Sequence, residues 1–165
     1  MSRAIYDFED LLEVMQSDGV MHQADRPTFT VHVPTQIGDV DGLMLLRWLE
    51  HEGVIHLVHA LPFIVPWKTR PAVVEALNAL NHALPLSGFS LHPTQAMPYY
   101  RRELTVAPRG WIFDDELRWW FGVSVDVVTT VLPALQRLAA GELTVDEFLE
   151  DPSLDLTRNF RPPAV

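Results

Sequence analysis

The segment from Thr69 to Val106 constrains the fold more than any other part of the sequence, because a helical repeat there leads directly into a strand repeat. Thr69 can cap a helix at its N-terminus, and Pro71 suits the first helical turn. Leu84 precedes Pro85 and is therefore disfavoured in the α conformation. Between these limits, apolar residues recur at the spacing of one helix face, and they are Val73, Leu77, Leu80 and Leu84. The pattern predicts an amphipathic helix from residue 70 to residue 84.

The second half of the same segment has the pattern of two β-strands. Apolar and polar residues alternate over residues 89–92 and again over residues 99–106. Residues 93–98 begin and end with proline, which is a turn signal. Two alternating stretches joined by a short turn predict a β-hairpin after the helix.

The part of the chain before this segment predicts one helix and three strands. Residues 7–18 carry apolar side chains at helical spacing. Strands are expected at residues 28–34, 43–50 and 54–63, with a tight turn at 51–53. The strand at 43–50 is apolar on both faces, so we expect it to lie centrally in the sheet or to be covered by a partner. Its two faces are Met44, Leu46 and Trp48 on one side and Leu43, Leu45 and Leu49 on the other.

The C-terminal part predicts two more helices. Asp114–Glu116 is acidic and suits a helix N-terminus, and apolar residues follow one helical face as far as Leu138. Pro133 lies inside this helix, and we expect it to kink the helix or restart it near residues 129–132. A capping box at Thr144–Glu147 predicts a short last helix.

These elements predict an α+β fold: a helix, a three-stranded antiparallel meander, a helix, a β-hairpin and C-terminal helices. We expect residues 1–150 to form a single domain, because the length suits one core and no linker interrupts it. Residues 151–165 have charges, prolines and little periodicity, so we expect an extended or mobile tail.

The charge of the chain limits its partners. Twelve Lys and Arg residues against 22 Asp and Glu residues give a net charge of −10, which argues against direct contact with nucleic acid. The same charge can steer a basic protein partner, including one that itself binds nucleic acid. The absence of cysteine suits a reducing compartment, and the first residues are acidic without a long apolar run. We therefore expect a cytoplasmic protein that does not contact a membrane.

No pattern of reactive residues predicts an active site, a metal or a cofactor. The seven histidines are scattered, and the interval from His51 to His56 is one residue too long for the zinc signature H-E-x-x-H. No glycine-rich phosphate loop occurs in the sequence. Ser90 resembles half of a nucleophile elbow, but His92 stands where that motif needs a second glycine. We expect a protein that is not an enzyme, and a hydrolase built on Ser90 and a histidine is the third-ranked hypothesis.

Two further sets of residues suggest roles outside catalysis. Asn81 shares the apolar helix face with Leu77, so we interpret Asn78 and Asn81 as structural polar anchors bonded to backbone groups, with a ligand contact as the alternative. The chain also has five tryptophans, and adjacent helical residues such as Trp119 and Trp120 point about 100° apart. Exposed aromatic area usually marks an interface, and the alternative is that all five tryptophans fill the core.

Four short stretches, taken in order, resemble the YbjN family, whose members are labelled bacterial sensory transduction regulators. They are Leu77–Asn81, Gly88–Leu91, Tyr99–Leu104 and Leu132–Glu142. The order of elements is similar to that of the type III secretion chaperone-like fold. The resemblance covers residues 5–150 and implies a non-enzymatic homodimer that binds or regulates a segment of another protein. It brings no catalytic residues with it.

The favoured hypothesis is therefore a chaperone-like or regulatory protein-binding module. It would act as a homodimer on a segment of a partner protein, such as a basic or nucleic-acid-binding protein. The candidate contact residues are Trp48, Phe63, Trp67 and Trp119. The second hypothesis is a small-molecule sensor, motivated by Asn81 and a pocket under the middle helix.

Overall fold

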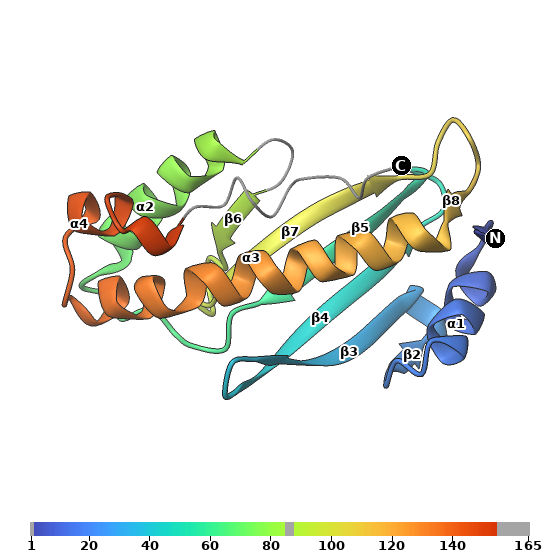
Figure 1. The fold of residues 1–165 in the computed structure, drawn as a ribbon, viewed down its shortest axis with the longest axis horizontal. Coiled ribbons are helices and arrows are strands. Elements are labelled where there is room, and N and C mark those ends of the chain that lie inside the picture. Colours follow the sequence, from blue (N-terminus) through green and yellow to red (C-terminus); the bar gives the residue numbers. More distant parts are fainter. Residues whose placement is uncertain (1, 85–87, 155–165) are drawn as a thin grey trace.

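The computed structural model describes residues 2–84 and 88–154, in which helices and strands are mixed along the chain (Figure 1). The helices are α1 (Phe8–Ser17), α2 (Arg70–Ala83), α3 (Asp114–Ala140) and α4 (Val145–Leu149), with short 3-10 turns at Arg26–Thr28 and Pro152–Leu154. The strands are β1 (Ala4–Ile5), β2 (Gln23–Asp25), β3 (Thr30–Ile37), β4 (Val40–Leu49), β5 (Val54–Ala60), β6 (Gly88–Leu91), β7 (Pro98–Thr105) and β8 (Ile112–Phe113). The α+β fold class predicted from the sequence is confirmed.

Six strands form one antiparallel sheet in the order β2-β3-β4-β5-β7-β6. The predicted meander is β3-β4-β5, and the predicted hairpin is β6-β7. The hairpin joins the meander through β7, which pairs with β5, so β6 lies at the edge. The strands β1, β2 and β8 were not predicted, because two or three residues are too few to show an alternating pattern.

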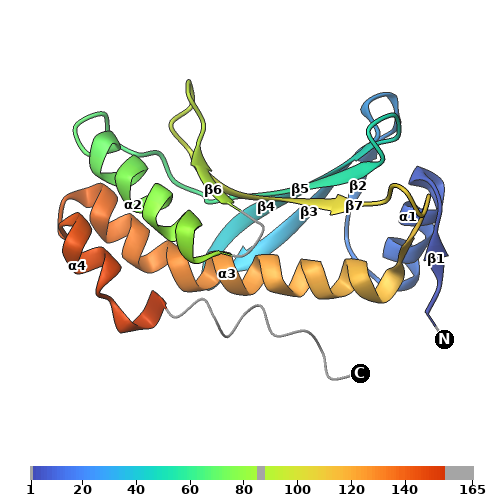
Figure 2. The same cartoon turned by 90° about the horizontal axis from the view of Figure 1, so that it is seen from above.

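All described helices that pack on the sheet lie on one of its faces, which we call the covered face (Figure 2). Helix α3 runs along this face, with α1 at one end and α2 and α4 at the other (Figures 1 and 2). One hydrophobic cluster joins α2, α3 and α4 to Phe89 and Tyr100, and a second joins α1 to Leu46, Leu57 and the start of α3. Side chains that the sheet directs toward the helices include Val31, Val33, Met44, Leu46, Trp48, Ile55, Leu57, His59, Tyr100, Arg102 and Leu104.

Helix α3 is continuous from Asp114 to Ala140 although Pro133 lies within it. It does not restart near residues 129–132, so that alternative of the prediction is wrong. Val127, Val128 and Val131 are completely buried there, and this burial outweighs the strand preference of β-branched residues. By length and composition α3 is able to cross a membrane, but 56% of its most apolar window is buried inside the protein, as in the core helix of a folded domain.

Local capping signals set several helix ends. The carboxylate of Asp7 accepts the Asp10 N–H at 2.9 Å, and Thr144 and Glu147 form the predicted capping box. Thr69 does not cap α2; its hydroxyl instead donates to the carbonyl of Ala139 at 2.7 Å. This bond ties the start of α2 to the end of α3. Of the predicted tail, residues 152–154 form a 3-10 turn, and residues 155–165 lie outside the described residues.

Candidate functional site

The second face of the sheet, which we call the open face, is not covered by any helix of the described chain (Figure 2). Successive side chains of a strand point to opposite faces, so each open-face residue is the sequence neighbour of a core residue. The open face should therefore be polar if nothing binds there. Its centre is instead apolar, and it consists of Pro34, Leu43, Leu45, Val58, Ala60 and Tyr99.

The strand register brings these six residues together, and we call them the open-face patch. Pro34 pairs with Leu43, Leu43 pairs with Ala60, and Ala60 pairs with Tyr99 in a single row across four strands. In the next row, Leu45 pairs with Val58. Leu43 is 38% exposed, which is high for a leucine in the interior strand of a sheet. The patch is therefore a contiguous apolar surface in contact with water, which is typical of an interaction site.

Charged and polar residues of both signs surround the open-face patch. Arg47, His56 and Glu103 form a row across β4, β5 and β7, and His56 Nε2 lies 3.3 Å from Glu103 Oε1. His32 and Arg101 stand at the two ends of the row that contains Leu45 and Val58. An apolar centre with a polar rim is the usual composition of a protein interface.

The four aromatic residues predicted to contact a partner do not form one surface. Trp48 is only 6% exposed and packs in the cluster that includes α1, so little of its side chain is open to a partner. Phe63 and Trp119 are partly buried against the cluster around α2 and α3. Trp67 is 72% exposed and lies in the loop between β5 and α2. Between Leu43 and Leu49, the side of β4 that stays exposed is the one that carries Leu43.

The two asparagines of α2 differ in their surroundings. The Asn81 amide donates to the Phe89 carbonyl at 2.9 Å, and the Phe89 N–H donates to Asn81 Oδ1 at 2.6 Å. These two bonds pair the backbone N–H and C=O of Phe89 on the edge strand β6 and attach this strand to α2, which is what a structural polar anchor does. Asn78 is exposed. Both asparagines line a shallow hollow of about 270 Å³ beside Ser90 and Tyr99.

His59 is a completely buried histidine that the sequence pattern did not single out. Its Nε2 lies 2.9 Å from Thr35 Oγ1, and its Nδ1 lies 3.2 Å from Ser124 Oγ on α3. Burial lowers the pKa of His59 to about 4, and the contact with Ser124 only partly opposes this effect. The ring is therefore neutral near pH 7. Serine beside histidine occurs in hydrolases, but both residues are sealed in the core, so this contact holds α3 to the sheet.

The hydrolase hypothesis gains no support at Ser90. Ser90 lies on β6 opposite Tyr99, and His92 accepts the N–H of Gln95 within its own turn. Within residues 2–84 and 88–154, no group of three His, Asp or Glu side chains is placed to hold a metal ion. The arrangement with the clearest capacity for binding is the open-face patch.

Comparison with known proteins gives the family of the chain. The family model described as "YbjN: Putative bacterial sensory transduction regulator" matches residues 7–137. The chain belongs to the YbjN family. Among solved structures it is similar to "Crystal structure of YbjN, a putative transcription regulator from E. coli", with a TM-score of 0.59 and 12% identity over 82% of this chain and 93% of that chain. At this identity the similarity concerns the fold. No curated protein matches the chain.

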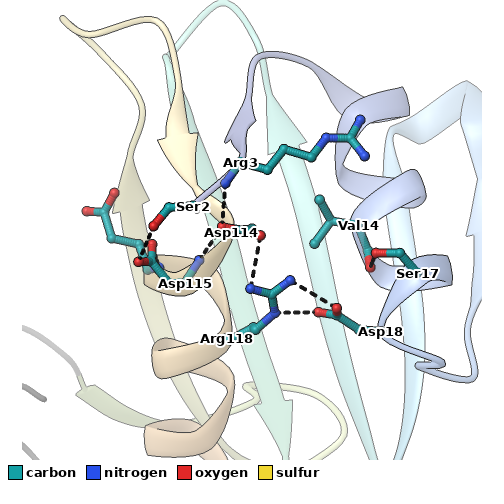
Figure 3. A network of polar contacts seen from close by, with 9 residues as sticks. Ser2, Arg3, Val14, Ser17, Asp18, Asp114, Asp115 and Arg118 are labelled. Carbon is teal, nitrogen blue, oxygen red and sulfur yellow. Dashed lines mark hydrogen bonds and ion pairs between the residues drawn. The ribbon is translucent and has the colours of Figure 1, made fainter.

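A polar network connects the end of α1 to the start of α3 (Figure 3). The guanidinium of Arg118 donates to the two carboxylate oxygens of Asp18 at 2.6 and 2.9 Å and lies 2.9 Å from Asp114 Oδ2. Asp114 also accepts the N–H of Arg3 at 2.9 Å. Burial opposes ionisation of Asp114, but the Arg3 amide and the Arg118 charge outweigh it and lower the pKa of this carboxyl. We call Asp18, Arg118 and Asp114 the clasp, and its role is structural.

Proposed function

We propose that this YbjN-family chain is a non-enzymatic, cytoplasmic regulatory protein that forms a homodimer and binds a segment of another protein on its open face. The observation that carries the proposal is the apolar open-face patch around Leu43, which no described helix covers. Antiparallel sheets with one solvated face normally alternate apolar and polar residues. β4 breaks this rule, which a bound partner would explain.

The composition of the open face indicates what kind of segment would bind. The patch offers leucine, valine, proline and tyrosine side chains, and the rim offers Arg47, Arg101 and Glu103. A segment with apolar side chains at its centre and polar groups at its edges matches this arrangement. The net charge of −10 acts at longer range and favours encounter with a basic protein. The family description as a regulator agrees with a binding role.

The experiment compares two lysine substitutions on β4. Leu43 and Val40 are 38% and 37% exposed, but they belong to opposite sides of the strand. We expect Leu43→Lys to abolish capture of the partner protein from a lysate of the source cells and to weaken self-association in sedimentation equilibrium. Val40→Lys is the matched control and should leave both properties unchanged.

Two results would contradict the proposed function. One is a wild-type protein that is monomeric and retains no other protein reproducibly. The other is capture of the same proteins, in the same amounts, by wild type and Leu43→Lys. Circular dichroism of both variants checks that the added lysine has not unfolded the sheet.

The hollow beside Asn81 does not favour the small-molecule sensor that the sequence suggested. Asn81 already exchanges two hydrogen bonds with the backbone of Phe89, and the hollow of about 270 Å³ is open to solvent. A ligand there would gain little burial.

A further inference from the structure

The apolar row of the open face is arranged symmetrically about β5. This row crosses five strands, of which β5 is the middle one, and it consists of Pro34, Leu43, Ala60, Tyr99 and Ser90. Leu43 on β4 and Tyr99 on β7 flank Ala60 of β5 from its two sides. A rotation by 180° about an axis along β5 would therefore place Leu43 of one copy against Tyr99 of a second copy.

The charged row of the open face has opposite charges on the two sides of β5. Arg47 of β4 and Glu103 of β7 both pair with His56 of β5, from opposite sides. The same rotation places Arg47 of each copy against Glu103 of the other, and such reciprocal contacts are the property of a two-fold interface. An axis across the strands would reverse the order of the rows, so the apolar row and the charged row could not both lie on themselves.

Both members of this charge pair are accessible to a second copy. Arg47 is exposed, and none of the ion pairs within residues 2–84 and 88–154 includes it. The exposed residues Glu50 and Glu52 line a hollow together with Arg47 but form no ion pair with it. Glu103 contacts His56 at 3.3 Å, but its side chain is 59% exposed. A carboxylate has two acceptor oxygens, so Glu103 can also accept a hydrogen bond from a second guanidinium.

We propose that a second copy of this chain covers the open face about a two-fold axis along β5, with Arg47 of each copy paired to Glu103 of the other. The inference rests on the proposed homodimer and names its interface. Opposite charges beside an apolar contact fix the register of two partners and disfavour other arrangements. A partner segment bound at Leu43 would displace the second copy, so self-association would keep the apolar patch covered until the segment binds.

The test reverses the two charges in separate chains. Arg47→Glu brings acidic residues together in both charge contacts of the homodimer, and Glu103→Arg brings basic residues together there. We expect each variant alone to self-associate at least about tenfold more weakly than the wild type, because juxtaposed like charges repel. An equimolar mixture of the two variants should associate again, since both contacts of the mixed dimer then join opposite charges.

Sedimentation equilibrium measures all of these samples at about 0.15 M salt, where exposed charges more than about 8 Å apart are largely screened. Asp126→Arg is the matched control, because it changes the net charge by the same amount as Glu103→Arg. Asp126 is exposed on α3 and does not belong to the open face. Self-association of this control should equal that of the wild type. Circular dichroism checks that every variant is folded.

A second measurement uses the wild-type chain alone. Isotope-labelled and unlabelled chains are mixed, and isotope-filtered NMR then detects only contacts between copies. We expect such contacts between the Leu43 methyl groups of one copy and the Tyr99 ring of the other. This measurement decides the orientation even if a charge variant fails to fold.

Three results would each overturn the proposal. They are a wild-type chain that stays monomeric, a mixture of the two charge variants that associates no better than either variant alone, and the absence of Leu43–Tyr99 contacts between copies. In the last two cases, capture of a partner protein that depends on Leu43 would still support the proposed binding function. Conversely, restored association of the mixture without any captured protein would support this interface and contradict that binding function.

Discussion

The two faces of the sheet come from the same strands, yet the helices within residues 2–84 and 88–154 cover only one of them. On β4, Leu46 is completely buried on the covered face, whereas Leu43 on the open face is 38% exposed. Both faces carry apolar residues. Strand alternation assigns each residue to a face, but it does not say what lies against that face. Helices α1 and α3 cover apolar residues of the covered face (Figure 2). The apolar residues of the open face need another explanation, and we infer that a partner covers them.

Polar residues on the two faces differ in the same way. His59 on the covered face sits between Thr35 and Ser124 with both ring nitrogens in contact. His56 on the open face is partly exposed and reaches Glu103 at the surface. A buried polar group must keep its partners, because water cannot replace them. The contacts of His59 on the covered face are therefore structural, while the polar side chains of the open face stay accessible to a partner.

The largest effect is expected when a side chain of the covered face is truncated. Leu46→Ala leaves a cavity beneath α1 and should lower the free energy of unfolding by about 2 to 5 kcal/mol. Urea denaturation followed by circular dichroism measures this loss. A loss below about 1 kcal/mol would mean that Leu46 is not a core position, and the distinction between the two faces would fail.

Acidification should weaken the covered face through His59. Its pKa falls from 6.5 to about 4 on folding, so the unfolded chain binds a proton that the folded chain excludes between these values. The stability of the wild type should therefore be complete above pH 6.5 and decrease toward pH 4, by roughly 3 kcal/mol from this group. His59→Gln should lose this part of the pH dependence in urea titrations at several pH values.

His56→Gln is the matched control for the histidine experiment, because His56 lies on the same strand but on the open face. This variant should keep the wild-type decrease in stability between pH 6.5 and pH 4. If His59→Gln keeps the decrease as well, the burial of His59 is not its cause.

The clasp at the end of the covered face should contribute a smaller amount. Asp114→Asn weakens the contacts with Arg118 and Arg3 and should cost about 1 to 3 kcal/mol at neutral pH. The folded pKa of Asp114 is depressed, so its contribution is present above the ordinary value of 3.8 and is lost as the pH falls through the folded value. The difference between wild type and Asp114→Asn should shrink at low pH.

The neighbouring Asp115→Asn variant tests whether the clasp depends on Asp114 in particular. Asp115 is exposed, and its side chain accepts a hydrogen bond from Ser2 at 2.7 Å. Its substitution should change stability by no more than about 0.5 kcal/mol. Equal losses in the two variants would show that helix-start charge, and not the clasp, is what stabilises α3.

Periodicity predicted the elements of the fold well, because burial on one side leaves a repeat in the sequence. Helix α2 (Arg70–Ala83), the meander and the hairpin all follow from this signal. The restart near Pro133 was wrong because the burial of neighbouring valines overrides local preference. Strands of two or three residues, such as β1, have no repeat to detect.

Only part of the candidate site could be predicted from the sequence. The sequence shows that β4 is apolar on both faces, but nothing local says which face the helices cover. The large aromatic side chain of Trp48 lies on the covered face, since tryptophan occurs in cores as well as in interfaces.

The smallest effect on the isolated chain is expected at the open face, and it separates folding from binding most directly. Leu43→Ser should lower the free energy of unfolding by less than about 1 kcal/mol in dilute protein, because its side chain is 38% exposed and no described helix packs on it. Urea titrations at several protein concentrations extend the test. A loss that grows with concentration would identify a second copy as the cover, since only then does association add to the stability of the wild type. A large loss at every concentration, comparable to that of Leu46→Ala, would instead make the open face part of the core and remove the basis for a partner there.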